Sequence, residues 1–576
     1  MDLTTRLSPS AIRQRTTGPL ILELDLTEGL AEGLPSDPFA AILAMRRTRL
    51  LDVLDGLKRA SKDPRVRALV VKVGGSRIGL ARIQELRGAI TEFRESGKLT
   101  VAWTESFGEF TRGNLPYYLA TAFEKIYLQP TGTLGLTGIA VEQVFVHDAL
   151  AKLGVDFQSG KRYEYKTAAD ALTETGFTEP ARQTAQRLAS SIAEQVAAGI
   201  TESRGKTPEQ ARELLDRGPF LAPQALEEGL VDELGYRDQV YRAVRKEAGK
   251  GAILQFVGRY QRMHALAQRA RRLPNPRERF VAVIYATGPI RQGRSSRGPV
   301  GGGAMGSDTV AAALRSARTD ERVRAVLLRV NSPGGSAVAS DTIWREVVRI
   351  RAAGKPVVVS MGDVAASGGY FIAMAADTIV AQPGTLTGSI GVILGKPVIE
   401  QLLDRAGVVV DTAGATSRSR MFAATHPFSE EEWDQINTWL DAIYRDFTTK
   451  VASGRGMTAD RVHELARGRV WTGADALANG LVDELGGLDR ALAQARRTAG
   501  LGIAAPVRQY PRVRPVDRLR PVTSSESRGA AAARLADAPL SQILLAESWG
   551  PAWRLAAAAG LSPLGPLTLP GSWTFE

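Results

Sequence analysis

One stretch of this 576-residue chain occurs twice, and the two occurrences lie about 250 positions apart. The heptapeptide GLVDELG stands at 229–235 and again, unchanged, at 480–486. The apolar stretch YYLA at 117–120 is matched by YFIA at 370–373. Self-similarity over such a distance indicates that one folding unit has been duplicated, and a fold for this chain must accommodate two copies of it.

Each copy alternates β-branched apolar runs with helical stretches. The clearest pair of runs is VRALVVKV at 66–73 and VRAVLLRV at 323–330. Buried strands separated by helices favour a mostly parallel sheet with crossover helices. The length also exceeds what one hydrophobic core supports. The sequence therefore predicts an α/β protein with two tandem domains related by internal duplication.

Five segments follow from this pattern. A polar tail (1–17) precedes the N-terminal domain (18–257), a connector (258–279), the C-terminal domain (280–500) and a tail (501–576). The connector is Arg-rich and is expected to begin as a helix, and the final tail opens with an Arg/Pro-rich linker at 508–521.

The end of the tail is rich in Ala and Leu and contains Trp549 and Trp553. This composition fits a helix that packs on the protein or a neighbouring subunit. It also fits an amphipathic helix at a membrane surface.

Ser367 lies between a predicted strand at 357–359 and a helix-permissive apolar stretch at 370–376. Its neighbours are only alanine and glycine, which let a substrate backbone approach closely. The helix N-terminus that follows presents free N–H groups to a developing oxyanion. Ser367 is therefore a candidate nucleophile, and the alternative is a tight turn in which it only caps the helix.

Two further loops of small residues accompany this one. The segment NSPGGS at 331–336 follows an apolar run, and GTLTGSIGV lies at 384–392. Loops that end neighbouring strands of one α/β layer converge at the same edge of the sheet. Together the three loops predict a peptide-binding cleft.

These three motifs, NSPGGS, ASGGY and TGSIGV, resemble the signal peptide peptidase A (protease IV) family. The resemblance extends over residues 18–500 and includes the duplication of the family's long form. It implies a crotonase-like fold of the kind seen in Clp protease subunits, and a serine endopeptidase that cleaves short apolar peptides such as remnant signal peptides. It also implies a homo-oligomer and membrane association.

The general base is assigned by this resemblance, because the chain contains many lysines. The segment SGKRYEYKTAA at 159–169 is similar to the family's G-K-Y-K-S-A stretch, whose second lysine is the base. That position is Lys166. Extra residues separate the two lysines here, so Lys161 is the second candidate.

The remaining site residues follow from the same resemblance. The N–H groups of Gly368, Gly335 and Gly334 are expected to form the oxyanion hole. Ser389 either orients the lysine amine or is an ordinary turn hydroxyl.

The two copies have lost complementary residues. Asn114 stands where Ser367 stands in the other copy, and the stretch matching the lysine segment, at 414–420, contains no lysine. One copy retains the base and the other the nucleophile, which predicts a single site built from both. A catalytically inactive peptide- or membrane-protein-binding scaffold and an acyl-CoA enzyme of the crotonase fold are the alternatives.

Composition excludes several other classes of chemistry. The chain has no cysteine, so disulfides and thiolate catalysis are excluded, and only four histidines. The formal charge of +13 is compatible with peripheral contact at an anionic membrane, but no nucleic-acid-binding motif accompanies it. No metal, nucleotide or other cofactor is implied, and neither a signal peptide nor a membrane-spanning stretch is predicted, so a cytoplasmic or peripheral location is expected.

Overall fold

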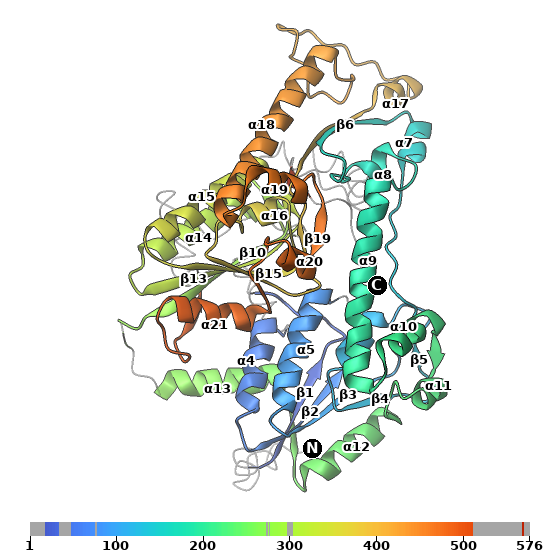
Figure 1. Ribbon diagram of the computed structural model, residues 1–576, viewed down its shortest axis with the longest axis vertical. Helices are drawn as coiled ribbons and strands as arrows, with labels where there is room; N and C mark the ends of the chain where they lie inside the picture. The colour runs from blue at the N-terminus through green and yellow to red at the C-terminus, as the bar shows by residue number, and fades with distance from the viewer. Residues whose placement is uncertain are drawn as a thin grey trace. The chain divides into compact units, whose positions relative to one another are not determined.

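The computed structural model describes residues 18–33, 48–74, 78–271, 275, 277–295, 303–510 and 567–568. These residues form two compact units. The first unit draws on 1–140 and 189–277, and the second on 141–188 and 278–575 (Figure 1). The segment 141–188, expected within an N-terminal domain of residues 18–257, is therefore part of the second unit.

The first unit is built on a sheet of parallel strands in the order β8-β4-β3-β2-β1-β9. These strands are β1 (Leu20–Asp25), β2 (Val66–Lys72), β3 (Leu99–Thr104), β4 (Lys125–Leu128), β8 (Glu233–Leu234) and β9 (Ile253–Phe256). A short antiparallel pair joins β5 (Thr133–Leu134) to β7 (Phe220–Leu221). The central strands β1 to β4 are mostly buried, as expected for a parallel sheet that helices cover on both faces.

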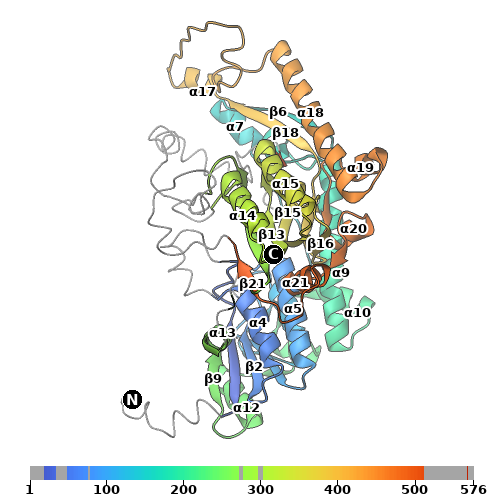
Figure 2. The same ribbon diagram turned by 90° about the vertical axis from the view of Figure 1, so that its left-hand side faces the viewer.

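The helices of this unit follow the predicted alternation with strands. They are α4 (Leu50–Ala60), α5 (Leu80–Arg94), α6 (Asn114–Ala120), α10 (Pro208–Arg217), α11 (Ala222–Glu227), α12 (Arg237–Ala248) and α13 (Val257–Arg271). Helices α4 and α5 lie side by side (Figures 1 and 2). Val240 and Val244 of α12 pack on Ile21, Val70 and Val101 of the sheet. Helix α13 occupies most of the expected connector.

The second unit repeats this plan with a larger sheet in the order β19-β17-β15-β13-β10-β21, in which β16 also pairs with β15 and β20. Its strands are β10 (Phe280–Thr287), β13 (Val323–Ser332), β15 (Val357–Ala366), β16 (Thr378–Ala381), β17 (Leu386–Gly388), β19 (Val470–Thr472), β20 (Glu484–Leu485) and β21 (Val507–Gln509). Among these described strands only the β17–β19 pairing is antiparallel. The mixed α/β fold and its duplication, expected from the sequence, are confirmed.

Helices again cover both faces of this sheet, with α14 and α15 on one side and α21 on the other (Figure 1). The helices are α14 (Ser307–Thr319), α15 (Ala337–Ala352), α16 (Gly368–Phe371), α18 (Glu430–Arg455), α19 (Ala459–Leu465), α20 (Gly473–Ala478) and α21 (Leu488–Thr498). Small strands β11 (Ile290–Arg291), β12 (Met305–Gly306), β14 (Gly334–Gly335) and β22 (Leu567–Thr568) form a separate sheet.

The segment 141–188 joins the second unit through one long strand pairing. Strand β6 (Asp156–Arg162) pairs antiparallel with β18 (Val392–Val398), and both lie along α18 (Figure 2). Short helices α7 (His147–Leu153), α8 (Asp170–Thr173) and α17 (Glu400–Arg405) flank this pair, and α9 (Glu179–Arg204) follows it. Helix α18 begins with a capping box between Ser429 and Glu432.

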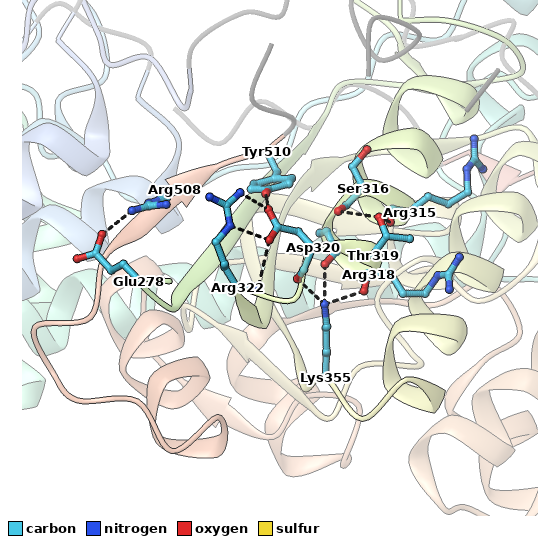
Figure 3. Close-up of polar contacts among 11 residues, drawn as sticks. Glu278, Arg315, Ser316, Arg318, Thr319, Asp320, Arg322, Lys355, Arg508 and Tyr510 are labelled. Carbon is cyan, nitrogen blue, oxygen red and sulfur yellow. Dashed lines mark hydrogen bonds and ion pairs between the residues drawn. The ribbon is translucent and has the colours of Figure 1, made fainter. Parts of the chain in front are cut away.

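The duplication extends to partly buried polar contacts. In the second unit Asp320 accepts two hydrogen bonds from the Arg322 guanidinium and one from the Tyr510 hydroxyl, while Lys355 Nζ donates to three backbone carbonyls (Figure 3). The hydrogen bonds from Arg322 hold the pKa of Asp320 well below its usual range. The same roles are taken in the first unit by Asp63, Arg65, Tyr260 and Lys98.

The structure differs from the expected linker at its start. Residues 507–509 form β21 at the edge of the sheet beside β10, and Arg508 pairs with Glu278 at 2.5 Å. Trp549 and Trp553 lie outside the described residues. Within the described part of the chain, no helix combines the length and apolarity needed to cross a membrane.

Candidate active site

Ser367 lies where β15 ends and α16 begins, and its side chain is fully buried. Its backbone adopts φ 55° and ψ −116°, a conformation that L-residues rarely occupy. The Ser367 N–H donates to the Gly388 carbonyl at 2.8 Å. Such strain costs on the order of 1–3 kcal/mol and persists where the surroundings impose it, often at functional sites.

Lys166 reaches Ser367 from the segment that follows β6. Its Nζ lies 2.8 Å from Ser367 Oγ, 2.9 Å from Ser389 Oγ and 3.1 Å from the Ser389 carbonyl oxygen. Burial lowers the pKa of Lys166 well below 10.5, because the charged ammonium is desolvated. A neutral amine can donate to Ser389 and accept the Ser367 hydroxyl proton.

Lys161, the second candidate, is held elsewhere. Its Nζ lies 2.9 Å from Asp170 Oδ1, and about a third of its side chain is exposed. It lies on β6, where it pairs with Ile393 of β18. The structure thus brings Lys166, and not Lys161, to the serine.

The glycine loop at 334–335 lies against the start of α16. A Cβ on Gly368 would lie 2.7 Å from Ser340 Oγ and 3.1 Å from the Gly335 backbone nitrogen. The absence of side chains at these positions lets two backbone segments approach each other beside Ser367. The backbone nitrogen of Gly335 thus lies on a segment directly adjacent to Gly368.

Strand β14, which contains Gly334 and Gly335, has an edge that accepts an extended chain. Here β22 pairs with it antiparallel, with Gly335 opposite Leu567 and Gly334 opposite Thr568. An extended segment can therefore bind by strand addition at the same two glycines.

A turn at 467–469 also contributes to the site and was not identified from the sequence. The Arg467 carbonyl accepts the N–H of Tyr165 at 3.2 Å, and the Arg469 carbonyl accepts the N–H of Ser389 at 2.7 Å. Between them Gly468 packs on Lys166, since a Cβ there would lie 2.6 Å from the Lys166 Cα. The turn thus holds the backbone beside Lys166, which contacts the Ser367 hydroxyl, and that of Ser389, which contacts the Lys166 amine.

Side chains reinforce the same turn. Arg467 pairs with Glu164 at 2.6 Å, and the Arg469 guanidinium stacks 3.9 Å from the Tyr165 ring. Arg467 has φ 56° and Ser389 φ 51°. Of the four non-glycine residues with positive φ in the described ranges, three therefore lie at this site. The sequence contains one signal of this turn, the Arg-Gly pair at 467–468, which recurs in the first copy at 217–218.

In the first unit, the position that corresponds to Ser367 holds an amide side chain. Asn114, which stands in the position of Ser367, donates from Nδ2 to the Gly138 carbonyl at 2.8 Å and accepts the Thr137 N–H at 3.1 Å. Both hydrogen-bonding ends of the side chain are therefore occupied by the backbone at residues 137–138. This arrangement contains no nucleophile at the position of the serine.

The histidines have other contacts. His147 lies 2.9 Å from Asp148, and His463 lies 3.0 Å from the Tyr444 hydroxyl. No group of three or more potential metal-ligating side chains occurs among the described residues. Among the described residues, Lys166 is the basic side chain whose hydrogen bond to Ser367 Oγ the structure records.

Comparison with known proteins agrees with this geometry. Residues 92–250 and 349–502 match the model of peptidase family S49, and residues 304–385 match that of Clp protease. Protease 4 of Salmonella typhi is 34% identical over 471 residues, covering 79% of this chain and 73% of the relative. Protease 4 of Haemophilus influenzae is 31% identical over 468 residues, covering 78% and 73%. The chloroplastic serine protease SPPA of Arabidopsis thaliana is 32% identical over 448 residues, covering 77% of this chain and 64% of the relative.

Proposed function

Because the chain belongs to peptidase family S49 and is a serine-type peptidase, we propose that it hydrolyses peptide bonds with a Ser367/Lys166 dyad. The observation that carries this proposal is the 2.8 Å contact between Lys166 Nζ and Ser367 Oγ in a fully buried setting. A serine hydroxyl needs a base to attack a carbonyl. A lysine whose pKa is lowered by burial is neutral, and can accept that proton, at a lower pH than an exposed lysine.

The reaction then proceeds in two halves. Ser367 Oγ bonds to the scissile carbonyl carbon while its proton passes to Lys166 Nζ. The ammonium returns this proton to the leaving amine as the C–N bond breaks, leaving an acyl-enzyme. Water attacks the ester, again losing a proton to Lys166, and the acid product leaves as Ser367 regains its hydrogen.

We assign stabilisation of the tetrahedral oxyanion to the N–H groups of Gly368 and Gly335, with Gly334 shaping the loop. Adjacency of the two backbone segments supports this assignment. Ser389 is assigned to orient the amine, since both its hydroxyl and its carbonyl contact Lys166 Nζ.

The proposed substrates are short apolar peptides in extended conformation, such as remnants of signal peptides. The edge of β14 supports an extended substrate, because β22 already pairs there antiparallel. The name of one relative, a putative signal peptide peptidase from Enterococcus faecium that is 39% identical over 179 residues, supports the substrate class. We further propose that the protein assembles with itself and contacts an anionic membrane surface through its excess of basic residues.

Purified full-length protein should cleave a quenched fluorescent apolar peptide. It should not hydrate the double bond of an enoyl-CoA thioester, because the proposed serine nucleophile attacks a carbonyl carbon and not an alkene. Both substrates would be assayed on the same preparation, with Ser367→Ala as the blank. Turnover of the thioester alone would favour the acyl-CoA enzyme, and turnover of neither would favour the inactive scaffold.

Gly468→Ala should lower kcat by roughly 100-fold or more with little change in KM, since misplacing a catalytic group by about 1 Å costs this much. The added methyl group meets the Lys166 backbone, not the substrate. The matched control is Gly354→Ala, which also has positive φ (74°) but nothing within 4 Å of the new Cβ. An equal loss of kcat in both variants would show that backbone strain, and not displacement of Lys166, is responsible.

A further inference from the structure

The strand pair β6–β18 joins the two copies in an asymmetric way. Strand β6 comes from the first copy and β18 from the second. Each copy should contain an equivalent of both strands. Displaced by the 253 positions that separate Tyr117 from Tyr370, the equivalent of β6 is 409–415 and that of β18 is 139–145.

Local structure supports this equivalence. Helix α7 is followed by Gly154 with φ 79°, and the next residue, Val155, donates its N–H to the Leu150 carbonyl at 2.9 Å. Helix α17 is followed by Gly407 with φ 68°, and Val408 donates to the Leu403 carbonyl, also at 2.9 Å. The same turn thus leads into β6 in one copy and into 409–415 in the other.

Neither equivalent segment is part of a strand in the described chain. Residues 404–419 are exposed throughout, and they include three consecutive valines, of which Val409 is 91% exposed. Residues 139–145 alternate between half-buried and exposed, as a strand on the surface does, and Val144 is 70% exposed. Consecutive exposed β-branched residues indicate a surface that another chain covers.

We propose that 409–415 of one molecule pairs antiparallel with 139–145 of a second copy of this chain. This pairing repeats between molecules the one that β6 and β18 make within a molecule. In that register Val410 lies opposite Val144, and Val409 lies opposite Phe145. The exposed apolar residues of the two segments therefore cover each other.

We assign the partner as a second copy of this chain, because each of the two segments, 409–415 and 139–145, has its complementary segment in the same sequence. Such a contact joins two different surfaces, so successive molecules add head to tail until the assembly closes. This strand pairing rests on the self-assembly proposed above and supplies its contact, and it does not depend on the Ser367/Lys166 dyad. Assembly and peptide hydrolysis are separate readouts of one sample.

The absence of cysteine makes the register testable by disulfide formation. A Val144→Cys chain mixed with a Val410→Cys chain should give a disulfide-linked species of twice the 61.8 kDa chain mass after oxidation. Asp411→Cys replaces Val410→Cys in the control, because a shift of one residue turns the side chain to the opposite face. Cross-linking no greater than this control would overturn the pairing.

Sedimentation of the full chain provides a second test. The wild type should sediment as a multiple of 61.8 kDa, and the double variant Val409→Asp/Val410→Asp should shift to the single chain at the same concentration. Ile503→Asp, at a site that is 80% exposed, is the matched control and should assemble as the wild type does. A wild type that sediments as a single chain, or a double variant that assembles normally, would contradict the proposal.

Discussion

Replacing Ser367 with alanine should reduce peptide hydrolysis by about 10⁴-fold or more, since loss of the nucleophile in a serine peptidase has effects of this size. Alanine retains the Cβ already present at φ 55°, so it adds no backbone strain. Its neighbours Ala366 and Gly368 leave the turn unaltered. The measurement is kcat on the fluorescent peptide, together with thermal unfolding to verify the fold.

The control for this variant is Ser336→Ala. Ser336 caps α15, with its Oγ accepting the Ala339 N–H at 3.3 Å, so the change should cost about 1 kcal/mol of stability. Hydrolysis should remain within a few-fold of the wild type. Activity that survives Ser367→Ala would instead require a different nucleophile.

Lys166→Met should be nearly as damaging as Ser367→Ala. Methionine fills much of the buried volume but cannot accept the serine proton. The double variant should be little worse than either single one, because residues that act as one catalytic unit are not additive. Multiplication of the two losses would indicate that Lys166 and Ser367 act independently.

The wild-type pH profile follows from the direction of the pKa shift. The base is active only when neutral, so kcat/KM should rise with pH through the pKa of Lys166 in the free enzyme. Burial lowers that pKa, and the rise should therefore be complete well below pH 10.5. Lys161→Met, which removes an ion pair with Asp170 and not the base, should retain both the activity and this profile.

The strand-ending serine and the glycine loops could be predicted from local sequence. Their residues are contiguous, and the turns between strands and helices depend on neighbours in the chain. The parallel order of β10, β13 and β15 likewise follows from the alternation of elements. Strand β21 was missed because three residues beside prolines have no periodic signal, and its pairing depends on the edge of β10.

The base required a resemblance because its burial comes from distant residues. Lys166 is covered by Gly468, which is 302 positions later, and contacts Ser389, which is 223 positions later. No local pattern distinguishes it from a surface lysine. The domain boundary was displaced for the same reason, since 141–188 joins the second unit through β18.

The dyad is tested most directly by the rate at which a fluorophosphonate modifies Ser367, followed by mass spectrometry of intact and digested protein. This probe reports the nucleophilicity of the serine without requiring a known substrate. In the wild type the label should be confined to Ser367, and its rate should increase with pH to a plateau reached well below pH 10.5. In Lys166→Met the label should be almost absent at every pH, while Lys161→Met should match the wild type. Labelling of Ser367 at the wild-type rate in Lys166→Met, or labelling of another serine, would contradict the account.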